Sequence, residues 1–223
     1  MQDNNVLTNS DIDEEIRIAA IEERDIDFMG KVLPGLSLQK RVIEQTLNLE
    51  GATVLSGISL ENTVLKKGIK ANAAQIHGSF YLGEAQINGD LEFSDIKIEG
   101  GINFVEAMVA GSLNLDNLHS EGFVSLSRAQ FKKDVFLRNM TVNDSYQAGL
   151  IIKGDVYLRE AVIAGNLDLT GTSIEGTLDI MRIFVGGDVI LEKTKIANYF
   201  ICKKAIIKGK FNLNETNYKE IIN

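Results

Sequence analysis

The sequence predicts an all-β fold, a right-handed β-helix solenoid with about 22 residues per coil, roughly eight coils and a short N-terminal capping helix. Three observations predict it. An eleven-residue unit repeats along most of the chain, each unit carries two short apolar alternations, and a glycine usually separates the two.

The repeat is clearest from Ala74, where successive units read AQIHGSFYLGE, AQINGDLEFSD and IKIEGGINFVE. The same frame extends backward through ATVLSGISLEN and RVIEQTLNLEG to GKVLPGLSLQK, which places Val32 at position three of its unit. Positions one, three, seven and nine are apolar or small in nearly every unit. Position five is usually glycine, as at Gly78, Gly89, Gly187 and Gly209.

Each alternation has the period of a β-strand that buries one face. A unit is therefore two very short strands with a corner between them, and glycine there allows a backbone conformation that a Cβ would resist. Two units would close one four-sided coil, and coils would stack at the usual strand spacing of about 4.8 Å. A β-sandwich and a leucine-rich repeat are the alternatives, but the first needs variable hairpins and the second a longer unit with an asparagine ladder.

One unit is irregular. MTVNDSYQAG, residues 140–149, is a residue short, with Asp144 at the corner and Tyr146 and Ala148 at positions that are usually large and apolar. It is interpreted as a kink or bulge, or as a local bend that shapes a binding surface.

The ends of a solenoid need caps because they expose apolar residues and unpaired backbone. Ser10 followed by Asp13 is typical of a helix start. We expect a tail and capping helix over residues 1–25, with the helix near 11–24, and a solenoid over residues 26–223. At the other end, Tyr218 and Ile221 would seal the last coil or meet a second copy.

Composition limits the function. A net charge of −8 argues against direct nucleic-acid binding. The chain has one cysteine, Cys202, which excludes an internal disulfide. The inward position of Cys202 in the repeat predicts a core residue. No secretory signal and no membrane span are recognisable, so we expect a cytoplasmic protein.

His77 and His119 face outward about two coils apart, and no cluster has catalytic or metal-ligand spacing. We therefore expect neither an enzyme nor a cofactor.

The outward positions predict candidate interaction surfaces. One apolar ladder comprises Val162, Phe184 and Ile206, and a second comprises Phe136, Tyr157 and Ile201 beyond Asp179. A smaller patch, Leu33 and Leu55, is expected beneath the N-terminal helix. A basic ridge is expected where one corner carries Arg138, Arg159, Arg182, Lys203 and Lys204, with Glu160, Glu192 and Glu215 close enough to neutralise part of it.

The pattern resembles the pentapeptide-repeat superfamily, whose members form a right-handed quadrilateral β-helix. The likeness lies in triplets such as Ala85-Gln86-Ile87 and Leu91-Glu92-Phe93, and it covers about residues 26 to 223. The chain departs from that family by its five-plus-six spacing and by a large residue at position seven. Bactofilin-like filament solenoids are a weaker resemblance.

The sequence favours a non-enzymatic structural or protein-interaction solenoid of unknown specific role that self-associates through its C-terminal half. The resemblance to pentapeptide-repeat proteins implies a second hypothesis, a DNA mimic that binds a type II topoisomerase. The overall acidity agrees with it, but the basic ridge and the lack of an evident long projecting loop oppose it. A filament-forming scaffold is the third, and an enzyme acting on a polymer the fourth. The protein partner itself is not encoded in these patterns.

Overall fold

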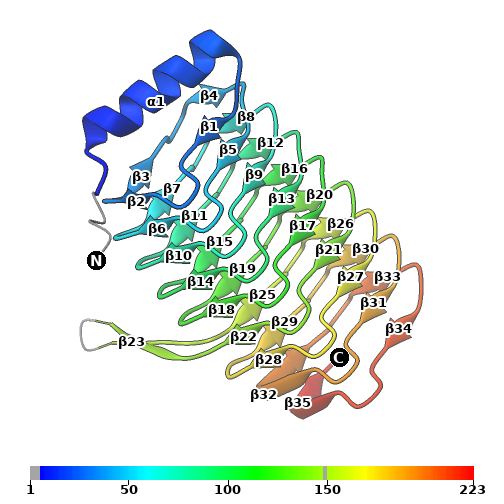
Figure 1. The fold of residues 1–223 in the computed structure, drawn as a ribbon. Helices are drawn as coiled ribbons and strands as arrows, with labels where there is room; N and C mark the ends of the chain where they lie inside the picture. The colour runs from blue at the N-terminus through cyan, green and yellow to red at the C-terminus, as the bar shows by residue number, and fades with distance from the viewer. Residues whose placement is uncertain (1–5, 148–149) are drawn as a thin grey trace.

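The computed structural model describes residues 6–147 and 150–223. The chain winds into a four-sided parallel β-solenoid of about nine turns, one more than the sequence predicted, with a helix across its first coil (Figure 1). Within the described residues no helix combines the length and the apolar character that crossing a membrane requires.

Each side of the coil is a column of parallel strands, which we number in chain order. Side 1 contains β2 (Val32–Leu33), β6 (Thr53–Val54), β10 (Gln75–Ile76), β14 (Lys97–Ile98), β18 (His119–Ser120), β22 (Thr141–Val142) and β28 (Ser173–Ile174). Side 2 contains β3 (Leu36–Ser37), β7 (Ile58–Ser59), β11 (Phe80–Tyr81), β15 (Ile102–Asn103), β19 (Val124–Ser125), β25 (Val156–Tyr157) and β29 (Leu178–Asp179). The longer β32 (Lys195–Ile201) and β35 (Asn217–Ile222) follow both of these sides.

The other two sides are separate sheets. Side 3 contains β4 (Val42–Ile43), β8 (Val64–Leu65), β12 (Gln86–Ile87), β16 (Met108–Val109), β20 (Gln130–Phe131), β26 (Val162–Ile163), β30 (Phe184–Val185) and β33 (Ile206–Ile207). Side 4 contains β1 (Ile26–Asp27), β5 (Leu47–Asn48), β9 (Ile69–Lys70), β13 (Leu91–Glu92), β17 (Leu113–Asn114), β21 (Val135–Phe136), β27 (Leu167–Asp168), β31 (Val189–Ile190) and β34 (Phe211–Asn212).

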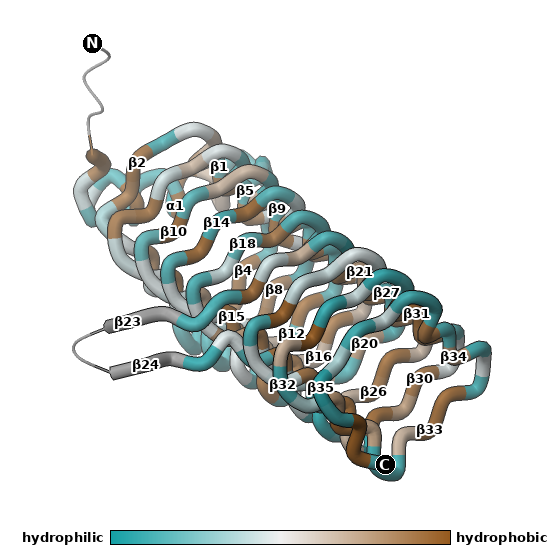
Figure 2. The backbone as a smooth tube through the Cα atoms, turned by 90° about the horizontal axis from the view of Figure 1, so that it is seen from below, coloured by the Kyte–Doolittle hydropathy of each residue, from teal (hydrophilic) through white to brown (hydrophobic). Residues whose placement is uncertain are grey.

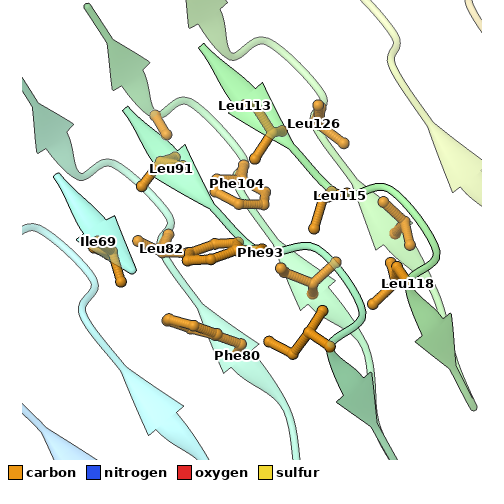
Figure 3. Packing of buried hydrophobic residues seen from close by; sticks show 14 of the residues in the cluster. Ile69, Phe80, Leu82, Leu91, Phe93, Phe104, Leu113, Leu115, Leu118 and Leu126 are labelled. Atoms are coloured by element: carbon orange, nitrogen blue, oxygen red, sulfur yellow. The ribbon is translucent and has the colours of Figure 1, made fainter. Parts of the chain in front are cut away.

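The core is a tube filled by the apolar positions of the repeat. Phe80, Phe93, Phe104 and Phe131 are fully buried and follow one another along the axis, with ring centroids 5.2, 6.2 and 6.4 Å apart. Figure 3 shows the first three of these rings. Aromatic pairs at these distances gain about 0.5–1.5 kcal/mol beyond the burial of their area. The expected inward positions are thus confirmed through the middle of the rod.

The first coil is one residue shorter than the sequence frame assumed. Leu33 pairs with Val54 and is fully buried, whereas Val32 pairs with Thr53 and faces outward. Only Pro34 and Gly35 separate the inward residues Leu33 and Leu36, so the unit starts at Lys31 and has ten residues. The prediction that Val32 is inward and that Leu33 forms a surface patch with Leu55 was therefore wrong; Leu55 alone is exposed there.

The irregular unit is an insertion. Strands β19 and β25 pair Val124 with Val156, 32 positions apart, whereas Ile102 and Val124 one coil earlier are 22 apart. The extra ten residues contain an antiparallel hairpin of β23 (Ser145–Gln147) and β24 (Leu150–Ile152), which extends from the side of the rod (Figure 1). The coils before and after the insertion remain stacked along one rod (Figure 2). The sequence frame had counted this segment as a unit of the coil, and that assignment was wrong. Ala148 lies outside the described residues.

Helix α1 (Asn9–Glu22) begins two residues earlier than predicted. Thr8 and Asp11 form the capping box in place of Ser10 and Asp13, because the Thr8 Oγ1 accepts from the Asp11 N–H and the Asp11 carboxylate accepts from the Thr8 N–H. Ile12 and Ala19 are buried against the first coil, where Ile26 and Phe28 are fully buried. The cap at this end is as expected.

The opposite end differs, because the inward residues of the last coil are partly exposed. Phe211 and Tyr218 retain 39% and 38% exposure, although the ring of each packs against that of Phe200. Ile221 is packed against the core, as is the half-buried Cys202.

Glycine at position five has a different cause from the one the sequence suggested. Among the described glycines, only Gly30, Gly51 and Gly171 have a positive φ. A Cβ at Gly187 would meet Asn166 Oδ1 of the preceding coil, and one at Gly209 would meet Asp188 Oδ1. Those oxygens accept the N–H of Asp188 at 2.8 Å and of Lys210 at 2.7 Å. Glycine thus makes room for a hydrogen bond between coils.

The left-handed backbone lies at position eleven instead, and it is mostly occupied by residues with a Cβ, such as Ala73 at φ 57°. Such a conformation costs an L-residue about 1–2 kcal/mol. Ala73→Gly should therefore stabilise the fold by about 0.5–1 kcal/mol, after glycine's larger unfolded-state entropy is subtracted. The measurement is the free energy of unfolding in urea.

Ala110→Gly is the matched control, because Ala110 is not among the residues of positive φ and should lose about 0.5–1 kcal/mol on becoming glycine. If Ala73→Gly and Ala110→Gly lowered the free energy of unfolding by the same amount, the backbone at position eleven would not be strained.

Candidate functional site: an apolar face on side 3

Side 3 presents a continuous column of uncharged side chains to the outside. The eight strands pair in parallel and in register, so that the first residue of each faces outward directly beside the next. We call this column the side 3 stripe. Its members are Val42, Val64, Gln86, Met108, Gln130, Val162, Phe184 and Ile206.

The stripe is long and accessible. Seven strand spacings of about 4.8 Å make it about 34 Å long. Val42 is 62% exposed, Met108 45% and Ile206 53%. Apolar residues scattered singly are normal on a surface, but a contiguous stacked row is typical of a contact face.

The middle of the stripe is hollowed. A depression of about 330 Å³ is lined by the stripe residues from Gln86 to Val162 and by their neighbours on side 3, among them Ala110 and Ala164. The two alanines contribute little side-chain volume there, and Asn88 and Lys132 are polar parts of the same lining.

The other sides carry polar and ion-paired groups. On side 1, His77 Nδ1 lies 2.8 Å from Glu99 Oε1, and His119 Nε2 lies 2.7 Å from Glu121 Oε1. Asp90 accepts the Ser112 N–H and pairs with Lys133, and these donors hold the pKa of its carboxyl below the usual range. In the part of the chain that the structure describes, no group of three or more His, Cys, Asp or Glu is arranged to hold a metal ion.

The structure brings together one predicted ladder and separates the other. Val162, Phe184 and Ile206 lie on adjacent strands, as expected. Tyr157 and Ile201 flank Asp179 on side 2, but Phe136 lies on side 4 between Asn114 and Asp168. The placement of Phe136 was wrong because the hairpin insertion had been counted as a unit of its own, which shifted the alternation of sides.

The same miscount affects the basic ridge. Arg138 is on side 4, where it pairs with Asp116 and lies 5.0 Å from the centre of the Phe136 ring. Arg159, Arg182, Lys203 and Lys204 follow the strands of side 2, but Arg159 pairs with Asp179, and Arg182 pairs with Glu160 at 2.9 Å. The arginines are thus largely neutralised by neighbouring carboxylates.

Sequence reasoning missed the N-terminal part of the stripe. Val42, Val64 and Met108 occupy position two of alternate units, which is also the position of Val162. Reading that position along every second unit from the first coil would have found them.

A polar network on side 2 replaces the apolar ladder predicted there. The half-buried Tyr157 hydroxyl donates to Asp155 Oδ2 at 2.5 Å, and Asp179, only 1% exposed, accepts from Arg159 and from the Met181 N–H at 2.9 Å. Burial and the hydrogen bond to Asp155 raise the pKa of Tyr157 to about 12. Each charge in this network has a partner.

These features define the class, a parallel β-solenoid repeat protein with one apolar outer face. No protein-family model, curated protein or solved structure matches the chain.

Tyr157→Phe should lower stability by about 1–3 kcal/mol, because the buried Asp155 carboxylate loses a donor. An unfolded tyrosine has a pKa of about 10. Since the folded-state pKa is raised to about 12, the contribution of the hydroxyl is present below pH 10 and is lost as the pH rises through about 12. Chemical unfolding at several pH values measures both effects.

Tyr81→Phe is the control, since Tyr81 lies on the same side of the coil with its side chain 36% exposed. A stability gap between wild type and Tyr157→Phe that does not narrow above pH 10 would contradict the assignment.

Proposed function

We propose that this chain is a non-enzymatic structural or protein-interaction solenoid that self-associates through the side 3 stripe. The observation that carries the proposal is the run of eight stacked outward residues without a formal charge, of which Val162, Phe184 and Ile206 form the most apolar end. The hairpin and the helix lie elsewhere. The hairpin leaves the coil between β22 and β25, at the corner of sides 1 and 2, and the helix crosses the first coil.

Energetics support this face over the others. Burying apolar surface stabilises by about 25 cal/mol per Å², whereas covering paired charges gains little. Sides 2 and 4 carry the paired arginines, and side 1 the histidine–glutamate pairs. The side 3 stripe is therefore the outward column with most to gain from a partner, and the charges of side 3, on Glu44, Lys66, Lys132 and Lys208, lie two positions away from it.

The relation to pentapeptide-repeat proteins is a proposal too. It is supported by the four-sided coil and by small residues such as Ala85 and Ala107 two positions before a buried centre. The five-plus-six spacing of buried centres sets this chain apart within such a relationship.

The test of self-association is sedimentation velocity across a range of protein concentrations. We expect the wild type to shift from monomer to dimer, and Phe184→Lys to remain monomeric, because a lysine in an apolar contact brings an unpaired charge that costs several kcal/mol to bury. Gln75→Lys on the exposed part of side 1 should dimerise as the wild type does.

A monomer at every concentration would contradict the proposal. A sedimenting mass that keeps increasing with protein concentration would indicate a filament. If Phe184→Lys and Gln75→Lys weakened dimerisation equally, side 3 would be excluded as the contact face.

A further inference from the structure

The stripe has an internal symmetry. Met108 stands at the fourth of its eight strands, with Gln86 and Gln130 one strand to either side. Two strands away on either side are Val64 and Val162, and three strands away are Val42 and Phe184. The order of side-chain types therefore reads nearly the same in both directions from Met108, with Ile206 beyond the matched part.

A two-fold interface needs this property, because residue i of one copy must contact residue j of the other while j contacts i. We propose that two copies of this chain pack side 3 against side 3 with their rods antiparallel, about a two-fold axis that passes beside Met108 and runs along the strands. The inference rests on the proposed function and names its partner. Met108 then meets Met108 of the second copy, Gln86 meets Gln130, Val64 meets Val162, and Val42 meets Phe184.

The residues beside the stripe agree with this arrangement. Two positions after each stripe residue stands a second residue of side 3, and together these residues form the flanking column. Because the axis runs along the strands, the flanking column of one copy faces the flanking column of the second copy in reverse order. Lys66 then faces Ala164, and Lys132 faces Asn88. Glu44 faces Gly186, and Ala110 faces itself. Lys208, like Ile206, lies beyond the matched part, and no like charges meet among the matched pairs. This matters because like-charge contacts across an interface cost several kcal/mol.

Parallel rods are less favourable. An axis along the rod that passes over the stripe would set each stripe residue against its own copy, an arrangement in which Val64→Cys would cross-link to itself. An axis along the rod and midway between the two columns would place the stripe of each copy against the flanking column, so that Val64 would meet Lys66 of the second copy and Val42 would meet Glu44. Both contacts bury a charged group against a branched aliphatic side chain, and that side chain offers the charge no compensating partner.

The depression lies where the axis passes. Its volume of about 330 Å³ is centred on the stripe between Gln86 and Val162, with Ala110 and Ala164 at its edge. It offers space for Met108 of the second copy, and an unbranched methionine fits an irregular gap well. The glutamine amides next to it would pair with each other across the axis, since each carries donors and an acceptor.

The size of the face predicts a reversible dimer. A face about 34 Å long and about 13 Å wide, four residues at 3.3 Å, covers about 450 Å² per copy, or about 900 Å² in total. That is below the standard interface of about 1,600 Å² and in the range of weak complexes.

Cysteine cross-linking tests the geometry. In a Cys202→Ser background, a short bismaleimide should cross-link Met108→Cys to itself, because the two residues face each other at the axis across sheets about 10 Å apart. The same reagent should not cross-link Val64→Cys to itself, since its two copies would lie about 19 Å apart along the rods, four strand spacings. Val64→Cys mixed with Val162→Cys should give a heterodimer with a short bismaleimide.

The outcomes separate the arrangement from the proposed function. Self-cross-linking of Val64→Cys together with failure of Met108→Cys would overturn the antiparallel geometry, even where sedimentation shows a dimer that Phe184→Lys abolishes. Loss of both the dimer and all cross-links would remove the proposed function as well. A folded, monomeric Met108→Lys variant, checked by circular dichroism, is expected if the axis is correctly placed, and an undiminished dimer of that variant would contradict it.

Discussion

The structure depends on one repeated interaction, the parallel backbone ladder that sets each coil directly above the last. Residues 22 positions apart pair in register on all four sides, as Leu91 pairs with Leu113 and Gln86 with Met108. Since the backbone N–H and C=O groups of these strands bond to the neighbouring coils, the position of each strand in the rod is set by the strand one coil before it. The core, the corners and the outer faces are all consequences of that stacking.

Stacking explains why chemistry on the surface comes in columns. A side chain one coil away lies about 4.8 Å off, near enough for an ion pair or a hydrogen bond. The chain uses this distance for Arg182 with Glu160 and for His77 with Glu99. Side 3 is the exception, because the stacked residues of its stripe carry no formal charge and most of them are apolar. What is left open on that face is apolar area, which a partner can cover.

The fold was predictable because the inward positions are numerous and periodic. Isoleucines and leucines such as Ile87 and Leu91 repeat at spacings that fit a strand with one buried face, and they are buried as expected. The two places where the predicted frame of the repeat failed are both changes in length. The ten-residue unit at Pro34 and the insertion after Asp144 alter the frame without altering the type of residue nearby. A frame read from residue types alone cannot tell a short unit from an inserted hairpin.

Prediction of the candidate site failed for the same reason. Val162, Phe184 and Ile206 follow the insertion and share one frame, so their alignment was predictable. Phe136 and Arg138 precede it and were assigned to the wrong side. The reason for glycine at position five was also hidden, because the carboxylate or amide oxygen that excludes a Cβ comes from the preceding coil.

The hairpin shows how tolerant this architecture is of added sequence. The chain leaves the rod after Val142 and rejoins it at Val156, and the pairs on either side, Val142 with Ile174 and Val124 with Val156, remain in register. Corners are thus places where segments of new length and composition can be grafted while the tube keeps its diameter. A solenoid of this kind can acquire an appendage by a single insertion, and its evolution or redesign can proceed one corner at a time.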